Sequence, residues 1–222
     1  MPTEPQPSSE RVRIRRLPAR GDYDPEAIAA ILDEALICHV GFSAGGQVYV
    51  IPTIHARVGE VLYLHGSPAS RMLKTLAGGG SCCVTVTLLD GVVLARSAFH
   101  HSLNYRSVVV LATATEVTDR ARKREALHAL VEQMIPGRST SCRMPNDEEL
   151  RRTTVLELPI SEASAKIRTG PPGDDEPDYA LDHWAGVIPL RLQANPPVAD
   201  PALAAHVEMP SHVRGWSPGP GP

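Results

Sequence analysis

The sequence predicts one antiparallel β-barrel flanked by helices, and three observations lead to this fold class. Short β-branched and aromatic runs separated by Gly-containing turns fill residues 38–66, which is typical of an antiparallel meander. Two longer apolar runs, over residues 82–99 and 106–118, contain further strands. Strictly alternating strand–helix units are missing, which excludes a doubly wound parallel sheet.

Two helices are predicted outside the main strand region, over residues 25–36 and 120–134. Asp24 can cap the first helix and Pro25 suits its first position, while Asp119 can cap the second. Apolar residues recur at helical spacing in both segments and give each helix one apolar face. These residues are Ile28, Ile31, Leu32, Ala35 and Leu36 in the first helix and Leu127, Leu130, Val131 and Met134 in the second.

The segments between these helices have their own signals. A short helix over residues 68–80 ends at glycines. The first long apolar run is interpreted as two strands joined by a turn at Asp90 and Gly91, which is a hairpin signature. The second is interpreted as the longest strand, and it is apolar on both faces from Val108 to Leu111, as a central strand would be. Further strands are expected over residues 153–160, 164–169 and 185–192, with a helical turn capped by Asn146 before them.

The ends of the chain differ in composition from the rest. Residues 1–22 are polar and basic and are expected to form a flexible N-terminal arm, and residues 23–194 one domain. Residues 195–222 are rich in Pro and Gly and are expected to form a tail.

Composition narrows the class of protein. A net charge of −3 and only two Phe, two Trp and five Tyr argue against a nucleic-acid partner. No run of ~18 apolar residues suggests a membrane span, and the N-terminus lacks the apolar core of a secretory signal. The four cysteines include no C-x-x-C pair, which argues against a structural zinc site. We therefore expect a cytoplasmic protein with reduced thiols and no metal site.

One polar stretch lies where a strand turns into the short helix. Ser67 and Ser70 fall in the turn, Arg71 in the first helical turn and Lys74 one turn later. Free amides and partial positive charge at a helix N-terminus favour an anion, and Arg71 would add a planar fork. The alternative is a solvated helix cap with two surface cations.

Two other stretches leave similar alternatives. Asn104 to Ser107 lie at the start of the long strand. The charge of Arg106 there needs an ion-pair partner or a bound anion. The alternative is a polar loop that ends where the strand becomes buried. Pro52 cannot donate to a sheet ladder and so belongs at an edge or a bulge. His55 and His65 lie on neighbouring strands, either as half-buried barrel residues or as ligand-pocket residues.

Together, "VIPTIHARVGEVLYLHGSPASRMLKTL", "HHSLNYRSVVVLATATEV" and "HWAGVIPL" resemble the FMN-binding split-barrel superfamily related to pyridoxamine 5′-phosphate oxidase. The flavin-nucleotide-binding and 5-nitroimidazole-resistance-type proteins are the most similar branches. The resemblance covers roughly residues 25–192. It implies a six-stranded antiparallel Greek-key split β-barrel, mainly β with flanking helices, and a homodimer with FMN at the interface.

The resemblance also implies a set of FMN-binding residues. They are Ile51, Pro52 and Thr53 at the isoalloxazine ring, Leu64 and His65 along the flavin, Ser70, Arg71 and Lys74 at the phosphate, Asn104, Tyr105, Arg106 and Ser107 on the cofactor, and Trp184 near the ring. Arg106 is also expected to join Ser70 and Arg71 in a clamp on the phosphate. Met72 departs from the oxidase proper, where a second phosphate-binding cation follows the arginine. The oxidase's C-terminal substrate-binding pattern is also missing, so vitamin oxidation does not follow.

The expected function is that of an FMN-dependent oxidoreductase acting on a small molecule, either oxidase-like or nitroreductase-like. In such chemistry the cofactor carries the electrons and the protein positions it, which explains why no acid–base pair stands out. His65 is the candidate catalytic residue above the ring. The alternatives are a non-catalytic flavin carrier or sensor on the same fold, and a structural barrel without a ligand.

Overall fold

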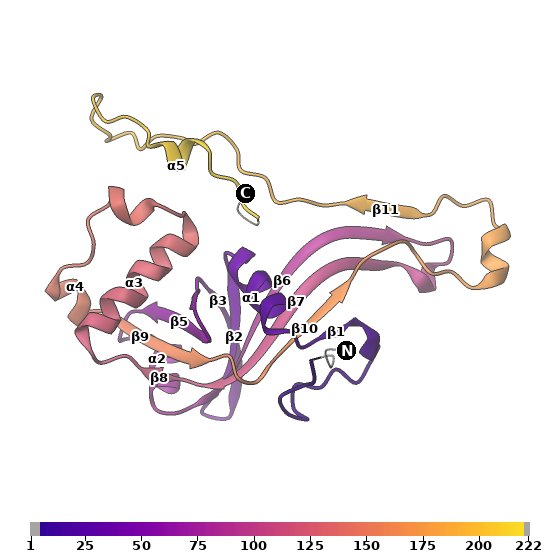
Figure 1. Cartoon of the computed structure of the whole chain (residues 1–222), viewed down its shortest axis with the longest axis horizontal. Helices are drawn as coiled ribbons and strands as arrows, with labels where there is room; N and C mark the ends of the chain where they lie inside the picture. Colours follow the sequence, from indigo (N-terminus) through magenta and orange to yellow (C-terminus); the bar gives the residue numbers. More distant parts are fainter. Residues whose placement is uncertain (1–4, 220–222) are drawn as a thin grey trace.

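The computed structural model describes residues 5–219 and shows a mainly β protein with helices on its surface (Figure 1). Within these residues the strands are β1 (Gly21–Asp22), β2 (Cys38–Ala44), β3 (Gln47–Thr53), β4 (Ala56–Val58), β5 (Val61–Gly66), β6 (Ser81–Leu94), β7 (Ser102–Thr113), β8 (Thr115–Glu116), β9 (Thr154–Pro159), β10 (Ala163–Arg168) and β11 (Gly186–Pro189). They form two sheets in which every pairing is antiparallel, as the sequence predicts.

The larger sheet has the order β1-β10-β7-β6-β2-β3, with β11 also paired to β6. The smaller sheet has the order β4-β5-β9-β8. β3 is an edge strand, and Pro52 lies in it opposite His39, which confirms the expected edge position. The strand mouth at residues 104–107 lies in β7, which is paired on both sides by β6 and β10.

The helices with a predicted cap residue begin directly after it, because helix caps are local signals. The short helix over residues 211–214 lies in the segment that the sequence predicts to be a tail. The helices are α1 (Pro25–Glu34), α2 (Arg71–Ala77), α3 (Arg120–Met134), α4 (Asp147–Arg151) and α5 (Ser211–Arg214), with short 3₁₀ turns that include η2 (Ala98–His100) and η4 (Glu176–Ala180). Asp24 and Asp119 each accept a backbone hydrogen bond at the start of α1 and α3. Asn146 and Glu149 form a complete capping box on α4.

Two clusters of buried side chains hold these elements together. The main core fills the space between the two sheets, α1 and α2, and includes Leu32, Leu64, Leu73 and Val110, each at most 1% exposed. Burying a side chain of this size contributes roughly 1.5–3 kcal/mol. A second cluster packs the inner face of α3 and Leu150 of α4 against β4 and β9. The apolar face predicted for residues 120–134 therefore has a partner on the body of the protein.

One prediction about the strands is wrong. Residues 81–94 form the single strand β6, with a register shift between Leu89 and Gly91, rather than two strands joined by a turn. At 14 residues β6 is also longer than β7, which has 12. The reason is tertiary: β7 pairs with one side of the Gly91 region and β11 with the other. A Cβ at Gly91 would lie 3.0 Å from Val187 Cγ1, so this glycine admits β11 instead of making a turn.

The outer halves of β6 and β7 extend away from the body together with β11 (Figure 1). We call residues 89–104 with β11 the β-extension, and residues 95–101 with 174–182 its tip. The tip lies at one end of the long axis of the molecule, whereas α3 and α4 lie at the other (Figure 1).

The terminal segments have defined contacts in the described residues. Arg11 pairs with Glu162, and β1 pairs with β10, so the N-terminal segment lies against the larger sheet. In the C-terminal segment, His212 lies within hydrogen-bonding distance of Ser141. The three-part division at residues 22 and 194 stays a prediction. Within residues 5–219 no helix is both long and apolar enough to cross a membrane.

Candidate functional site

The N-terminus of α2 presents an accessible cation. Ser70 is the N-cap and accepts from the amide of Leu73 at 3.5 Å, while its own amide donates to Ser67. Arg71 is exposed, and its guanidinium carbon lies 4.7 Å from the centroid of the Tyr49 ring on β3. Stacking on an aromatic ring leaves the edges of a guanidinium free to donate. Arg71 thus keeps free donors at this corner of the molecule, and an anion held by Ser70 and Arg71 stays a prediction.

The β3 segment next to this corner supplies an open sheet edge. Ile51 and Thr53 are half-buried, and Pro52 is exposed. Only β2 pairs with β3, so the backbone groups on its other side have no strand partner among the described residues. Ile51 packs against the main core, which holds this edge strand against the body of the protein. The arrangement suits a flat ligand whose polar edge pairs with backbone.

His65 on β5 is the half-buried histidine of this region. Its Nδ1 is buried and has no hydrogen-bond partner among the described residues. Burial lowers the pKa of the His65 imidazole below its ordinary value, so the ring is neutral near pH 7. Leu64, its neighbour, is fully buried in the main core, so only its backbone can face a ligand. A neutral imidazole with a free nitrogen is a good metal ligand.

Two adjoining cavities contact His65 and share the wall formed by Glu149 and Thr153. The first, the His65 cavity, has a volume of about 350 Å³, and its other lining residues are Ile54, Leu127, Leu130, Val131, Met134, Arg143 and Pro145. The second, the arginine cleft, measures about 660 Å³ and is also lined by Gly66, Ser67, Pro68, Ala69, Arg151 and Arg152. It joins His65 to the turn before α2.

The charges around these cavities are unevenly paired. Arg143 donates to both carboxylate oxygens of Glu149 and lowers the pKa of that carboxyl to about 2. Arg152 lies 3.9 Å from Glu148 in an exposed pair. Arg151 has no ion pair among the described residues. The arginine cleft therefore has an excess of positive charge.

The segment from Asn104 to Ser107 has partners within the chain. Arg106 uses four of its five N–H donors on the carboxylates of Glu34 and Asp90. Ser107 donates to the carbonyl of Lys166 at 3.2 Å. Tyr105 is half-buried and lies opposite Leu89 and Arg168. Contact between Arg106 and a phosphate would require these ion pairs to open.

Asn104 belongs to a buried polar contact that sequence reasoning missed. The Asn104 amide donates to the carbonyl of Gly170 at 3.1 Å and accepts from Arg168, which is 8% exposed. Arg168 also donates to the carbonyl of Pro171. These bonds close the loop that follows β10. Trp184, in contrast, is 69% exposed and lies beside Gly186 in the β-extension.

The predicted site residues thus fall into two groups. Ser70 and Arg71 lie at the N-terminus of α2 beside the edge strand β3, and His65 lies next to the turn that precedes α2. We call this region the α2 corner. Lys74 lies on the exposed side of α2. Asn104, Tyr105 and Trp184 lie toward the β-extension. Sequence reasoning found the apolar face of α3 but assigned no ligand to it. It also missed Arg143 and Arg151, because nothing local links them to His65.

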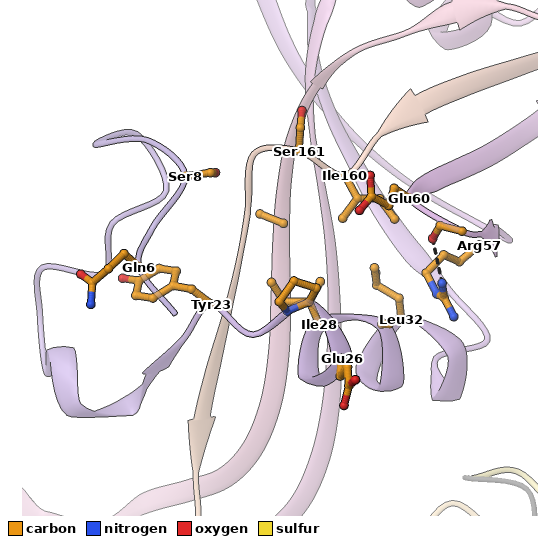
Figure 2. Close-up of a pocket in the computed structure, with 14 residues that line it drawn as sticks. Gln6, Ser8, Tyr23, Glu26, Ile28, Leu32, Arg57, Glu60, Ile160 and Ser161 are labelled. Carbon is orange, nitrogen blue, oxygen red and sulfur yellow. Dashed lines mark hydrogen bonds between the residues drawn. The ribbon is translucent and has the colours of Figure 1, made fainter. Parts of the chain in front are cut away.

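A third cavity, of about 530 Å³, lies beneath the N-terminal segment (Figure 2). Ile28, Leu32 and Ile160 form its apolar floor, and Glu60 and Arg57 lie at one side (Figure 2). Arg57 donates to both carboxylate oxygens of Asp33 and to the carbonyl of Gly59. None of the site residues predicted from the sequence lines this cavity, so it is separate from the α2 corner.

Comparison with known proteins agrees with the sequence resemblance. The family model described as pyridoxamine 5′-phosphate oxidase matches residues 24–167. The chain belongs to this flavin-binding family. A search of curated proteins finds no match.

Two solved structures are similar to this chain over most of its length. Flavocytochrome Anf3 from Azotobacter vinelandii is 44% identical, with a TM-score of 0.90 over 94% of this chain and 97% of that one. The FAD and heme binding protein from Mycobacterium smegmatis is 37% identical, with a TM-score of 0.85 over 90% of this chain and 98% of that one.

A third structure shows the fold alone. A putative 5-nitroimidazole antibiotic resistance protein from Bacteroides thetaiotaomicron is 23% identical, with a TM-score of 0.57 over 66% of this chain and 86% of that one. The split-barrel class that the sequence predicts is confirmed by these neighbours.

Proposed function

We propose that this family member is a redox protein that binds a flavin nucleotide and a heme. The observation that carries the proposal is the buried, unpartnered Nδ1 of His65 in the wall of a cavity that α3 lines with apolar side chains and that Arg143, Glu149 and Thr153 line with polar ones. Support comes from the two similar structures, one named a flavocytochrome and the other an FAD and heme binding protein.

The residues of the His65 cavity fit a porphyrin. Leu127, Leu130 and Val131 line the cavity with apolar side chains of the kind that a porphyrin face needs. Arg143 could pair with a carboxylate at the porphyrin edge if its two hydrogen bonds to Glu149 opened. His65 is neutral near pH 7 and needs to lose no proton before it ligates iron. In this proposal His65 is an iron ligand rather than the proton-transferring residue expected from the sequence.

The flavin belongs to the α2 corner in this proposal. Ser70 and Arg71 would hold the phosphate next to the ribityl chain, and the open edge of β3 would pair with the ring system. The family resemblance implies FMN, and the Mycobacterium smegmatis relative is named for FAD. We propose FAD, because that relative matches 90% of this chain. When bound, a flavin exchanges electrons singly or in pairs, and a heme iron exchanges them singly.

The chain's own residues then position and shield the two groups. His65 lines both the His65 cavity and the arginine cleft, and the cleft extends to the turn before α2, so the two cofactors would lie near each other in this proposal. The packed inner face of α3 would exclude water from the porphyrin side. An electron-transfer role explains why this region shows no acid–base pair suited to a small-molecule substrate. An FMN-dependent oxidoreductase without heme is the alternative, and it predicts flavin binding alone.

The assembly and location are also proposals. The β-extension carries apolar side chains, including Leu89, Leu103 and Ile188, that residues 5–219 leave exposed. Large exposed apolar surfaces mark interaction sites, so we propose a homodimer. The four cysteines are free, which agrees with the reducing cytoplasm expected from the sequence.

Reconstitution with hemin tests the heme assignment. Purified protein freed of cofactors is titrated with hemin and the Soret band is followed, for wild type, His65→Ala and the control His128→Ala. His128 is exposed on α3 and does not line the His65 cavity. We expect hemin affinity to fall at least tenfold in His65→Ala and to stay unchanged in His128→Ala. Equal affinity in all three proteins would overturn His65 as the ligand.

Flavin identity is tested separately. FAD and FMN are titrated by flavin fluorescence, and the flavin released from protein purified from cells is identified by chromatography. We expect FAD in the released fraction and at least tenfold tighter binding of FAD. Tighter binding of FMN, with no Soret band on hemin addition, would support the oxidoreductase alternative.

A further inference from the structure

The third cavity, beneath the N-terminal segment, takes no part in the proposed function. Its volume of about 530 Å³ falls within the range of small-molecule sites, which is roughly 300–1,000 Å³. Its lining comes mainly from the N-terminal segment, α1, the turn between β4 and β5, and the turn between β9 and β10. Segments that are distant in the sequence thus meet around one space, as they do in a preformed ligand site.

The floor of the third cavity is apolar and held by the main core. Ile28 and Leu32 of α1 are 6% and 1% exposed, and Ile160 packs against the same core (Figure 2). The space cannot collapse unless these side chains leave their close-packed neighbours. Because removing apolar surface from water is favourable, this floor suits a ligand with an apolar body.

The N-terminal segment is fixed where it covers one side of the cavity. Ser9 and Arg11 both donate to the carboxylate of Glu162. Farther along, the amide of Ile14 donates to the hydroxyl of Tyr23 at 2.8 Å, and Tyr23 itself lines the cavity. These contacts hold the covering segment against the body, so the cavity has a defined wall on this side.

The unpaired charge of the third cavity is negative. Arg57 is the one cation among the described lining residues, and its charge is balanced by the ion pair with Asp33. Glu60 lies beside Ile160 at the edge of the floor, and Glu26 lies on the first turn of α1 (Figure 2). Neither carboxylate has an ion pair within residues 5–219. Charge complementarity therefore favours a cationic ligand.

We propose that the third cavity binds a small molecule that combines an apolar body with a positively charged amine. The apolar body packs on Ile28, Leu32 and Ile160, and the ammonium group pairs with Glu60. Glu26 adds negative charge at the same site. The inference rests neither on the two cofactors nor on the assembly of the protein, because none of the residues assigned to the cofactors lines this cavity.

Two probes that share one apolar body and differ in charge test the proposal. Dansylcadaverine carries a primary amine, and dansylglycine carries a carboxylate. Each is titrated by calorimetry into the full-length protein as purified, with its cofactors bound. We expect one molecule of dansylcadaverine to bind per chain, and dansylglycine to bind about tenfold more weakly or worse.

A pair of variants on α1 locates the bound probe. Ala29 lines the cavity and is half-buried, so Ala29→Trp fills the space with an indole ring. Ala30→Trp is the matched control, since Ala30 is exposed on the same helix and does not line the cavity. We expect dansylcadaverine affinity to fall about tenfold or more in Ala29→Trp and to stay unchanged in Ala30→Trp.

A second pair of variants tests the charge. Glu60→Gln should weaken dansylcadaverine about threefold and bring the affinities of the two probes closer together. Glu116→Gln, which changes an exposed carboxylate elsewhere, should have no effect. Glu60 is exposed, so its replacement remains informative even if Ala29→Trp folds poorly by circular dichroism.

Three results would overturn the proposal. Absence of dansylcadaverine binding would refute the site. Equal affinity in wild type and a folded Ala29→Trp would show that the probe binds elsewhere. Equal affinity for the two probes in wild type, or no effect of Glu60→Gln, would refute recognition of the amine.

Discussion

Arg106 and Glu34 form a two-pronged ion pair that joins the middle of β7 to the last residue of α1. Asp90 on β6 accepts two further hydrogen bonds from the same guanidinium, at 2.8 and 3.0 Å. These contacts raise the pKa of the Arg106 guanidinium above its ordinary value, and Glu34 has a larger effect than Asp90. The arginine that the sequence assigned to a phosphate is therefore engaged in tying a helix to the sheet.

We expect Arg106→Ala to destabilise the protein, because it leaves two half-buried carboxylates without their cation. The cost should be about 1–3 kcal/mol, reduced by the partial exposure of the site. Urea unfolding followed by circular dichroism measures it. The preference for FAD over riboflavin should be unchanged in this variant. A selective loss of phosphate-bearing flavins would instead show that Arg106 binds the phosphate, as the sequence analysis predicts.

Replacing Arg71 should weaken flavin binding and leave stability nearly unchanged, which is the reverse of the effect expected for Arg106. Arg71 is exposed and makes no ion pair among the described residues, so Arg71→Ala should leave stability within about 0.5 kcal/mol of wild type. Loss of a charge-assisted phosphate contact should weaken FAD about tenfold to a hundredfold. Arg71→Lys should recover only part of that affinity, since the planar fork is lost. Fluorescence titration with FAD and riboflavin distinguishes these effects, with the exposed Arg13→Ala as control. Equal losses for both flavins would contradict a phosphate role.

His55 should make stability depend on pH. It is fully buried, with Nε2 2.9 Å from the carbonyl of Leu32 and Nδ1 unpartnered. Burial, more than any other cause, lowers its pKa from the ordinary 6.5. Between that lowered pKa and 6.5 the unfolded chain binds more protons than the folded one. The free energy of unfolding should therefore rise with pH through this window and fall as the pH drops below 6.5.

The slope from one such group is at most about 1.4 kcal/mol per pH unit. Urea unfolding at several values from pH 5 to 8 measures it for wild type and for His55→Gln, which does not titrate. We expect a smaller slope in the variant, even if the variant is less stable throughout. Parallel pH profiles would show that His55 is not the group responsible.

The buried thiols should resist alkylation in the native state. Burial raises the pKa of Cys38 to about 12 and that of Cys82 to about 11, so little thiolate forms at pH 8. Cys142 is half-exposed. Iodoacetamide followed by mass spectrometry should therefore label Cys142 first, and Cys38 and Cys82 only when urea is added. Native labelling of Cys38 as fast as that of Cys142 would contradict its place in the core.

The sequence by itself determined the elements whose signals are local. Asp24, Asp119 and Asn146 mark helix starts within a few residues of the amides they cap, so α1, α3 and α4 could be predicted from them. Pro52 pointed to an edge strand for the same reason, because its missing N–H is a property of one residue. The α2 corner followed from a turn, a cap and a cation adjacent in sequence.

Only the tertiary structure decided which distant residues meet. Gly91 looks like a turn residue in sequence, yet β11, almost 100 residues later, lies across it and keeps β6 continuous. Arg106 finds Glu34, which is 72 residues away, and Arg143 lies by His65 through the packing of α3 and α4 on β9. Such contacts depend on how elements pack, and sequence patterns over a few residues carry no record of a partner far along the chain. Local sequence signals thus predicted most of the helices and strands, whereas packing decided which carboxylates pair with Arg106 and which residues line the cavity beside His65.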